Sequence, residues 1–250
     1  MFEPFNYIEQ AWTKDLHILC FEPNKETVVT DSVATRININ KALWNQETNI
    51  SFHVAKEKSK SSVHPPNIQL IDKFLEKDWL DRQTENKIEL KATTLDSIIK
   101  ENNFRADFLK IDSQGSEYEI LEGSIESLNK GIFGALLETW SYPFHKNQKL
   151  TYEVMELMNQ YGYFLADLNK GGYYRRRILD SSSLFVGQIG QVDLLFFETF
   201  EKFTSIKRNS DEIIKAACLA DLYGMADYGI QILDYYKKFD RVISKIVKKK

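Results

Sequence analysis

The chain has 250 residues, 43% of them hydrophobic and 28% charged, which is enough to bury a core and is typical of a globular protein. Its formal net charge of -3 provides no general basic field, so we expect no nucleic-acid partner. Cys20 and Cys218 have neither disulfide-framework nor zinc-site spacing, which predicts free thiols in a reducing, cytoplasmic compartment. We expect no signal peptide in Met1–Gln10 and no membrane span, because no apolar run has the required length.

Short apolar runs alternate with helical patterns along most of the chain. The predicted strands are Ile18–Phe21, Thr35–Asn40, Asp107–Ile111, Ile132–Leu137, Tyr163–Leu168 and Val192–Thr199. The predicted helices are Thr94–Glu101, Glu117–Leu128 and Thr151–Tyr161. This alternation predicts an α/β fold with a mainly parallel sheet covered on both faces, and with functional groups at the carboxyl ends of the strands.

Two further segments lie outside this alternation. The pattern of Ser51–Pro66 predicts a surface hairpin that would suit a substrate rim or lid. From Asp211 the texture predicts a helical tail, so we divide the chain into a domain at 1–203 and a helical extension at 204–250. The tail end Tyr235–Lys250 has the pattern of an amphipathic basic helix, which either packs on the domain or contacts an anionic membrane surface or a partner.

Carboxylates follow several of the predicted strands. Asp112 comes directly after an apolar run, and because an unpaired buried charge is costly, its side chain should emerge at the sheet edge. Glu138 ends the next strand, so the two carboxylates are expected side by side, sharing a proton or holding a divalent ion. We favour the proton role over a metal. Glu22 ends an earlier strand, where it could also cap a helix beginning near Lys25.

Four stretches, in this order, resemble the FkbM-type methyltransferases: Cys20–Asn24 (CFEPN), Asn40–Trp44 (NKALW), Thr94–Ile98 (TLDSI) and Asp107–Gly123 (DFLKIDSQGSEYEILEG). Later pieces also fit, namely Leu136–Ser141 (LLETWS) and Val192–Phe197 (VDLLFF) as a closing strand. The resemblance implies a Rossmann-like class I methyltransferase sheet with an antiparallel closing strand. It also implies S-adenosyl-L-methionine as cofactor and O-methylation of a sugar, glycan or secondary metabolite.

The same resemblance implies roles for single residues. Glu22 would accept hydrogen bonds from the ribose hydroxyls, and Ala42 and Leu43 would line the adenine, although plain core packing is an alternative for this pair. Asp112 and Glu138 would act at the acceptor hydroxyl, which needs a base to remove its proton. His145, which follows a strand end, is interpreted as a solvated loop histidine.

The sequence departs from the family pattern at the glycine loop. The first glycine is Gly115, and nothing in the sequence corresponds to the first strand and glycine loop of this fold. That strand would lie between those ending at Phe21 and Ile111, so two strand edges should lack their partner. The late start of the sequence is one explanation. The other is a catalytically inactive binding module that presents Tyr173–Arg177 or the basic tail to a partner.

Overall fold

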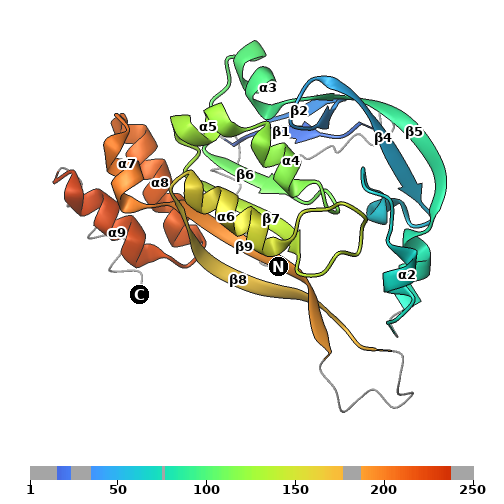
Figure 1. The fold of residues 1–250 in the computed structure, drawn as a ribbon. Coiled ribbons are helices and arrows are strands. Elements are labelled where there is room, and N and C mark those ends of the chain that lie inside the picture. The colour runs from blue at the N-terminus through green and yellow to red at the C-terminus, as the bar shows by residue number, and fades with distance from the viewer. Residues whose placement is uncertain (1–15, 24–34, 75–76, 177–186, 238–250) are drawn as a thin grey trace.

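The computed structural model describes residues 16–23, 35–74, 77–176 and 187–237, and its strands form three sheets. The first sheet pairs β1 (His17–Phe21) with β2 (Thr35–Ile39) in parallel. The second has the order β3 (Ala42–Leu43), β5 (Thr84–Thr93) and β4 (Thr48–Ala55). The third, which is the centre of the fold, has the order β6 (Phe108–Ile111), β7 (Gly134–Trp140), β9 (Gln188–Glu198) and β8 (Tyr163–Tyr174) (Figure 1).

The helices are short and most of them pack on the four-stranded sheet. They are α2 (Ile68–Ile71), α3 (Leu95–Glu101), α4 (Glu117–Glu122), α5 (Ile125–Lys130), α6 (Thr151–Gln160), α7 (Phe200–Ser205), α8 (Ser210–Leu222) and α9 (Ala226–Tyr235). Two 3-10 turns, η2 (Lys58–Lys60) and η3 (Lys77–Arg82), lie between β4 and β5. Among the described residues, no helix has both the length and the apolar character needed to cross a membrane.

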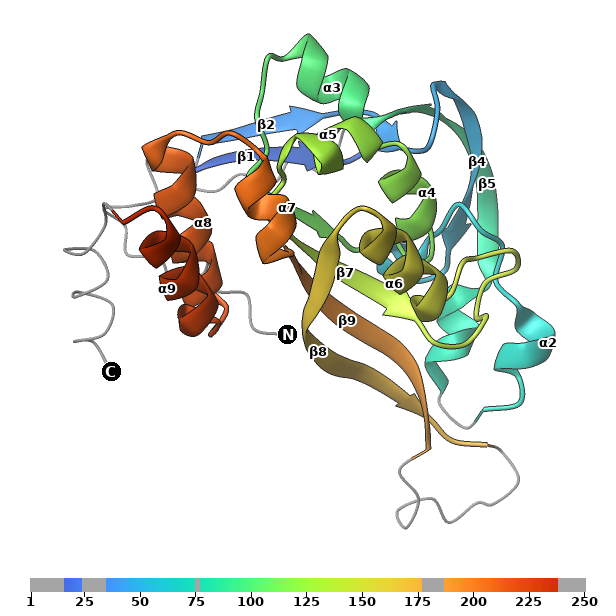
Figure 2. The same cartoon turned by 60° about the vertical axis from the view of Figure 1, so that its left-hand side comes forward.

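The four-stranded sheet is the middle of three layers (Figures 1 and 2). Side chains alternate between its faces, as the period of a strand requires. On β7, Ala135 and Leu137 join the core beneath α3 to α6, while Leu136 joins the core beneath α7 to α9. Because both faces of the sheet are covered, the sequences of its strands are nearly continuous apolar runs.

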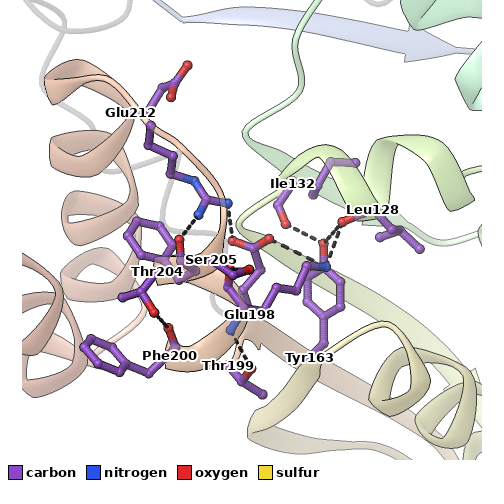
Figure 3. A network of polar contacts seen from close by, with 12 residues as sticks. Leu128, Ile132, Tyr163, Glu198, Thr199, Phe200, Thr204, Ser205 and Glu212 are labelled. Atoms are coloured by element: carbon purple, nitrogen blue, oxygen red, sulfur yellow. Dashed lines mark hydrogen bonds and ion pairs between the residues drawn. The ribbon is translucent and has the colours of Figure 1, made fainter.

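A buried cluster of charges ties α7 and α8 to the end of β9 (Figure 3). Glu198 is fully buried, and its carboxylate pairs with Arg208 at 2.6 Å and with Lys202 at 3.6 Å. The Tyr228 hydroxyl donates to the Glu198 carbonyl at 2.5 Å. Burial lowers the pKa of Lys202 to about 8, and its ammonium donates to the carbonyls of Leu128 and Tyr161. These contacts join the C-terminal helices to the domain.

The single, mainly parallel sheet expected from the sequence is not what the described strands form. Of the six strand pairs, β1–β2, β3–β5 and β6–β7 are parallel, and the three others are antiparallel. Among the described strands, β1 pairs only with β2 and β6 only with β7, so these two strands do not meet. The strand β9 lies antiparallel to both of its neighbours, β7 and β8.

Two local predictions were also wrong. β4 forms its ladder with β5, from Thr48 opposite Ala92 to Ala55 opposite Thr84, and the predicted hairpin within Ser51–Pro66 is reduced to one bridge between His53 and Ser62. The helix predicted over Glu117–Leu128 is broken between α4 and α5.

The helix break lies at Gly123, where the chain passes very close to Trp44. A Cβ at Gly123 would lie 2.1 Å from the Trp44 carbonyl oxygen, so only glycine permits this approach. Tyr235–Lys250 lies mostly outside the described residues. The division of the chain at residue 203 stays a prediction.

Candidate functional site

The loop after β6 is fixed by a buried carboxylate. Gln114 and Gly115 both have positive φ, at 59° and 113°, so the chain turns sharply before α4. The Glu117 side chain is 2% exposed and accepts hydrogen bonds from Ser113 N (3.0 Å), Ser113 Oγ (2.7 Å) and Gly115 N (3.1 Å). Burial raises the pKa of Glu117 in spite of these bonds. Glu117 therefore holds the loop in one conformation.

The loop brings the two predicted carboxylates to one amide. Gln114 Nε2 donates to Glu138 Oε1 at 2.8 Å and lies 3.4 Å from Asp112 Oδ1. Glu138 ends up near Asp112 because β6 and β7 are parallel neighbours whose carboxyl ends meet at one edge. Burial, followed by the charges of Asp112, Glu117 and Asp193, raises the pKa of Glu138 to about 8. Burial and these charges therefore favour the protonated form of Glu138.

Asp193 brings a third carboxylate to this edge, and the sequence analysis missed it. It lies on β9 directly opposite Glu138 in the β7–β9 register. Burial raises the pKa of the Asp193 carboxyl, and Asn169 of β8 lies 3.4 Å from its Oδ2. The available signal was a charged residue within the apolar run Val192–Phe197, which needs a reason to be buried.

Arg82 is a second residue that the sequence analysis missed. It is 8% exposed, and its Nη1 donates to Gln114 Oε1 at 2.9 Å. Its guanidinium lies 4.7 Å above the ring of Trp140, the last residue of β7. The same segment between β4 and β5 supplies Ser62, whose hydroxyl donates to the Gln114 carbonyl at 2.8 Å. No sequence motif identifies Arg82 as a site residue, because the residues that it contacts, Gln114 and Trp140, lie far from it in the sequence.

Two histidines lie behind the loop, and the interpretation of His145 as solvated was wrong. His145 is 1% exposed, its Nδ1 lies 3.2 Å from Gln148 Oε1, and burial lowers its pKa to about 3. The Gly115 turn lies against this ring, since a Cβ at Gly115 would be 3.4 Å from His145 Nδ1. His64 is also buried, with Nε2 3.4 Å from Glu119 Oε1. His145 therefore supports the loop from within the protein, whereas His64 contacts Glu119 of α4.

The residues expected to hold a nucleoside lie at the ends of β1 and β3. Glu22 directly follows β1, its N–H donates to Ile39 O at 3.1 Å, and Asn40 Nδ2 donates to its carbonyl at 3.3 Å. Ala42 is buried in a small cluster with Ile50 and Ala92. Leu43 is half-buried and packs against the core that contains Ile111.

A family model described as the methyltransferase FkbM domain matches residues 2–165. The chain belongs to the FkbM methyltransferase family. No curated protein and no solved structure matches it. Family membership supports methyl transfer as its general function and a Rossmann-like α/β architecture, and it implies a methyl donor. Asp112 and Glu138 lie within the matched region, whereas Asp193 lies beyond it.

This FkbM-family chain has residues that fit the adenosine half of S-adenosylmethionine. Glu22 provides a carboxylate at a strand end, a group that can accept hydrogen bonds from both ribose hydroxyls, and the half-buried Leu43 packs against the same core as Phe21, the last residue of β1.

The basic and aromatic cluster Tyr173–Arg177 lies at the end of β8, and the structure describes it as far as Arg176. The Arg176 guanidinium lies 4.7 Å above the Phe74 ring and donates to Gln188 Oε1 at 2.8 Å. Tyr174 packs 4.4 Å from Phe144, measured between ring centroids. The described part of this cluster thus contacts the protein's own aromatic residues.

Proposed function

We propose that this protein is an S-adenosylmethionine-dependent O-methyltransferase that acts in a reducing cytoplasmic compartment on a hydroxyl of a sugar, glycan or secondary metabolite. The observation that carries the proposal is the joining of Asp112 and Glu138 through Gln114 at the carboxyl ends of adjacent strands. An enzyme of this class needs a base beside the acceptor hydroxyl. The ionised form of Glu138 is suited to that task, because its raised pKa makes it a stronger base than an ordinary carboxylate.

In the proposed reaction, the acceptor O–H proton passes to the Glu138 carboxylate as the acceptor oxygen forms its bond to the methyl group. When bound, S-adenosylmethionine would supply that methyl from its sulfonium, whose carbon–sulfur bond breaks to leave the neutral thioether S-adenosylhomocysteine. Asp112 accepts a hydrogen bond from the acceptor and aligns its oxygen, and much of the rate gain in such a transfer comes from alignment. Glu22 holds the ribose hydroxyls, and Ala42 and Leu43 contact the adenine.

The alternative is a catalytically inactive methyltransferase-like binding module. The absence of any glycine before Gly115 supports it, because close approach of glycine backbone commonly holds a nucleotide-like cofactor. In that case the protein would bind a partner without binding the cofactor.

Calorimetric titration of the full chain with S-adenosylhomocysteine distinguishes the two functions, because this ligand retains ribose and adenine. The enzyme hypothesis predicts binding that Glu22→Gln weakens by about tenfold to a hundredfold, since a hydrogen bond to a charged group contributes about 1.5 to 3 kcal/mol. Glu156→Gln, exposed on α6, is the matched control and should bind normally. Absence of binding would favour the inactive module.

A turnover assay with labelled S-adenosylmethionine and a panel of glycosides then tests the acceptor and the base. We expect Glu138→Gln to lower turnover by about a hundredfold or more, since a general base contributes about 10² to 10⁴, and Asp112→Asn to lower it through lost alignment of the acceptor. Full turnover in both variants would show that the catalytic assignment is wrong.

A further inference from the structure

The amide of Gln114 is held in one of its two possible orientations. Its oxygen accepts from Arg82 Nη1 at 2.9 Å, and its nitrogen faces Glu138 and Asp112 at 2.8 and 3.4 Å. A flipped amide would place its NH2 group against the guanidinium, where two donors face each other, and its oxygen against the Asp112 carboxylate. The donor at Arg82 therefore selects the observed orientation.

We propose that Arg82 is a positioning residue, which fixes the Gln114 amide so that its nitrogen donates to Glu138 and Asp112. Arg82 acts through Gln114 and is not itself placed on the acceptor. The inference rests on the proposed function for its catalytic meaning, because Glu138 is the base in that reaction. The hydrogen bonds that link Arg82 to Glu138 through Gln114 do not depend on the proposed function.

The Gln114 backbone and the Arg82 guanidinium are both held in place by other residues. The Gln114 backbone is held by the Ser62 hydroxyl, which donates to its carbonyl at 2.8 Å. The Arg82 guanidinium is stacked on Trp140, and burial leaves the residue only 8% exposed. A planar guanidinium can stack and donate in its own plane at once, which lysine does poorly. The remaining freedom is the rotation of the amide, which Arg82 removes.

The charges around Glu138 give this contact a measurable consequence. Asp112 from the β6 loop, Glu117 from α4 and Asp193 from β9 all disfavour the ionised form of Glu138, as does burial. Arg82 from η3 acts in the opposite direction and lowers the pKa of Glu138. The hydrogen bond that Arg82 orients and the positive charge of Arg82 both lower the pKa of Glu138, because a donated hydrogen bond and a nearby cation both favour the carboxylate. Losing Arg82 should therefore make Glu138 harder to ionise.

An NMR titration of the full chain, labelled at its glutamate carboxyl carbons, tests the proposal. The Glu138 signal is assigned by its loss in Glu138→Gln, and we expect a wild-type midpoint of about 8. Arg82→Met should move this midpoint up by about one pH unit, and Arg82→Lys should return only part of that change, because lysine keeps the charge without the planar donor. An unchanged midpoint in folded Arg82→Met would overturn the proposal.

Arg176→Met is the matched control. Arg176 also stacks at 4.7 Å on an aromatic ring and donates to a glutamine oxygen at 2.8 Å, but its partners are Phe74 and Gln188. Its loss should leave the Glu138 midpoint unchanged. A change as large as that in Arg82→Met would mean that loss of packing, rather than the link through Gln114, moves the pKa.

A wild-type measurement covers the case in which Arg82→Met does not fold. The Gln114 side-chain NH2 signals should titrate with the Glu138 midpoint, because this nitrogen donates to Glu138. Gln114 NH2 signals that do not change as Glu138 titrates would overturn the proposed orientation of the Gln114 amide. These readouts need no turnover, so failure of methyl transfer would refute the proposed function and leave the test of Arg82 intact.

Discussion

Replacing Glu138 by glutamine should stabilise the protein above pH 8 and leave its stability almost unchanged near pH 5. Burial and three carboxylates raise the pKa of Glu138 from 4.5 to about 8 in the folded protein. Between these two values the native state holds a proton that the unfolded chain has released, so the free energy of unfolding falls as pH rises through this window. Glutamine removes the ionisation. Its carbonyl can still accept from Gln114 Nε2, as Glu138 Oε1 does.

The size of the effect follows from the interval between the two pKa values. At about 1.4 kcal/mol per pKa unit, the rise from 4.5 to about 8 sets an upper limit of about 5 kcal/mol. Glu138 is only partly buried, and solvent screens its interactions with the neighbouring carboxylates, so we expect about 2 kcal/mol. For a chain of this size, that corresponds to a rise in Tm of about 4 to 8 °C at high pH.

Urea unfolding of wild type and Glu138→Gln at a series of pH values measures this difference directly. The gap between the two curves should open as pH rises from about 5 and level off above pH 8. Glu156→Gln, on the exposed side of α6, should show no such dependence. A constant difference between wild type and Glu138→Gln across the series would refute the raised pKa of Glu138.

Three other substitutions test the supporting structure. Arg208→Met should lower the free energy of unfolding in urea by about 3 kcal/mol, because it leaves the fully buried Glu198 without its 2.6 Å partner; a loss below 1 kcal/mol would contradict this. Gly123→Ala should lower Tm by an amount corresponding to about 1 to 3 kcal/mol, because the added Cβ would lie 2.1 Å from the Trp44 carbonyl oxygen, and an unchanged Tm would show that this approach is not tight. Asp96→Ala should lower the free energy of unfolding in urea by about 1 kcal/mol, since Asp96 accepts hydrogen bonds from two backbone N–H groups at the start of α5. An unchanged free energy would mean that other groups cap that helix.

The sequence predicted the strands next to the site well because local signals define them. Ile18–Phe21 lies within β1, and Asp107–Ile111 extends only one residue beyond β6. Each is a short apolar run that ends at a polar residue. The expectation that Asp112 and Glu138 would lie close together depended only on adjacent parallel strands, and the structure brings both within reach of Gln114 Nε2. Their catalytic role stays a prediction.

The features that the sequence did not predict depend on distant contacts. Alternation in Ser51–Pro66 indicated a strand but not its partner, which lies about thirty to forty residues further along the chain in β5. Gly123 ends α4 because of Trp44, a neighbour that helical periodicity alone cannot show. His145 follows a strand end like a solvated residue, yet it is buried by the loop that it supports. Burial of polar side chains is decided by packing, which local patterns do not encode.

The position of Asp193 links the C-terminal helices to the site chemistry. Asp193 lies opposite Glu138 only in the observed β7–β9 register, and a slip of two residues would place the uncharged Gln191 or Leu195 there. Glu198, five residues later on the same strand, is held by Arg208, Lys202 and Tyr228. These contacts anchor the end of β9 and so fix which side chain faces Glu138. Loss of the Arg208 contact should therefore reduce the rise in the pKa of Glu138, although Arg208 does not contact Glu138.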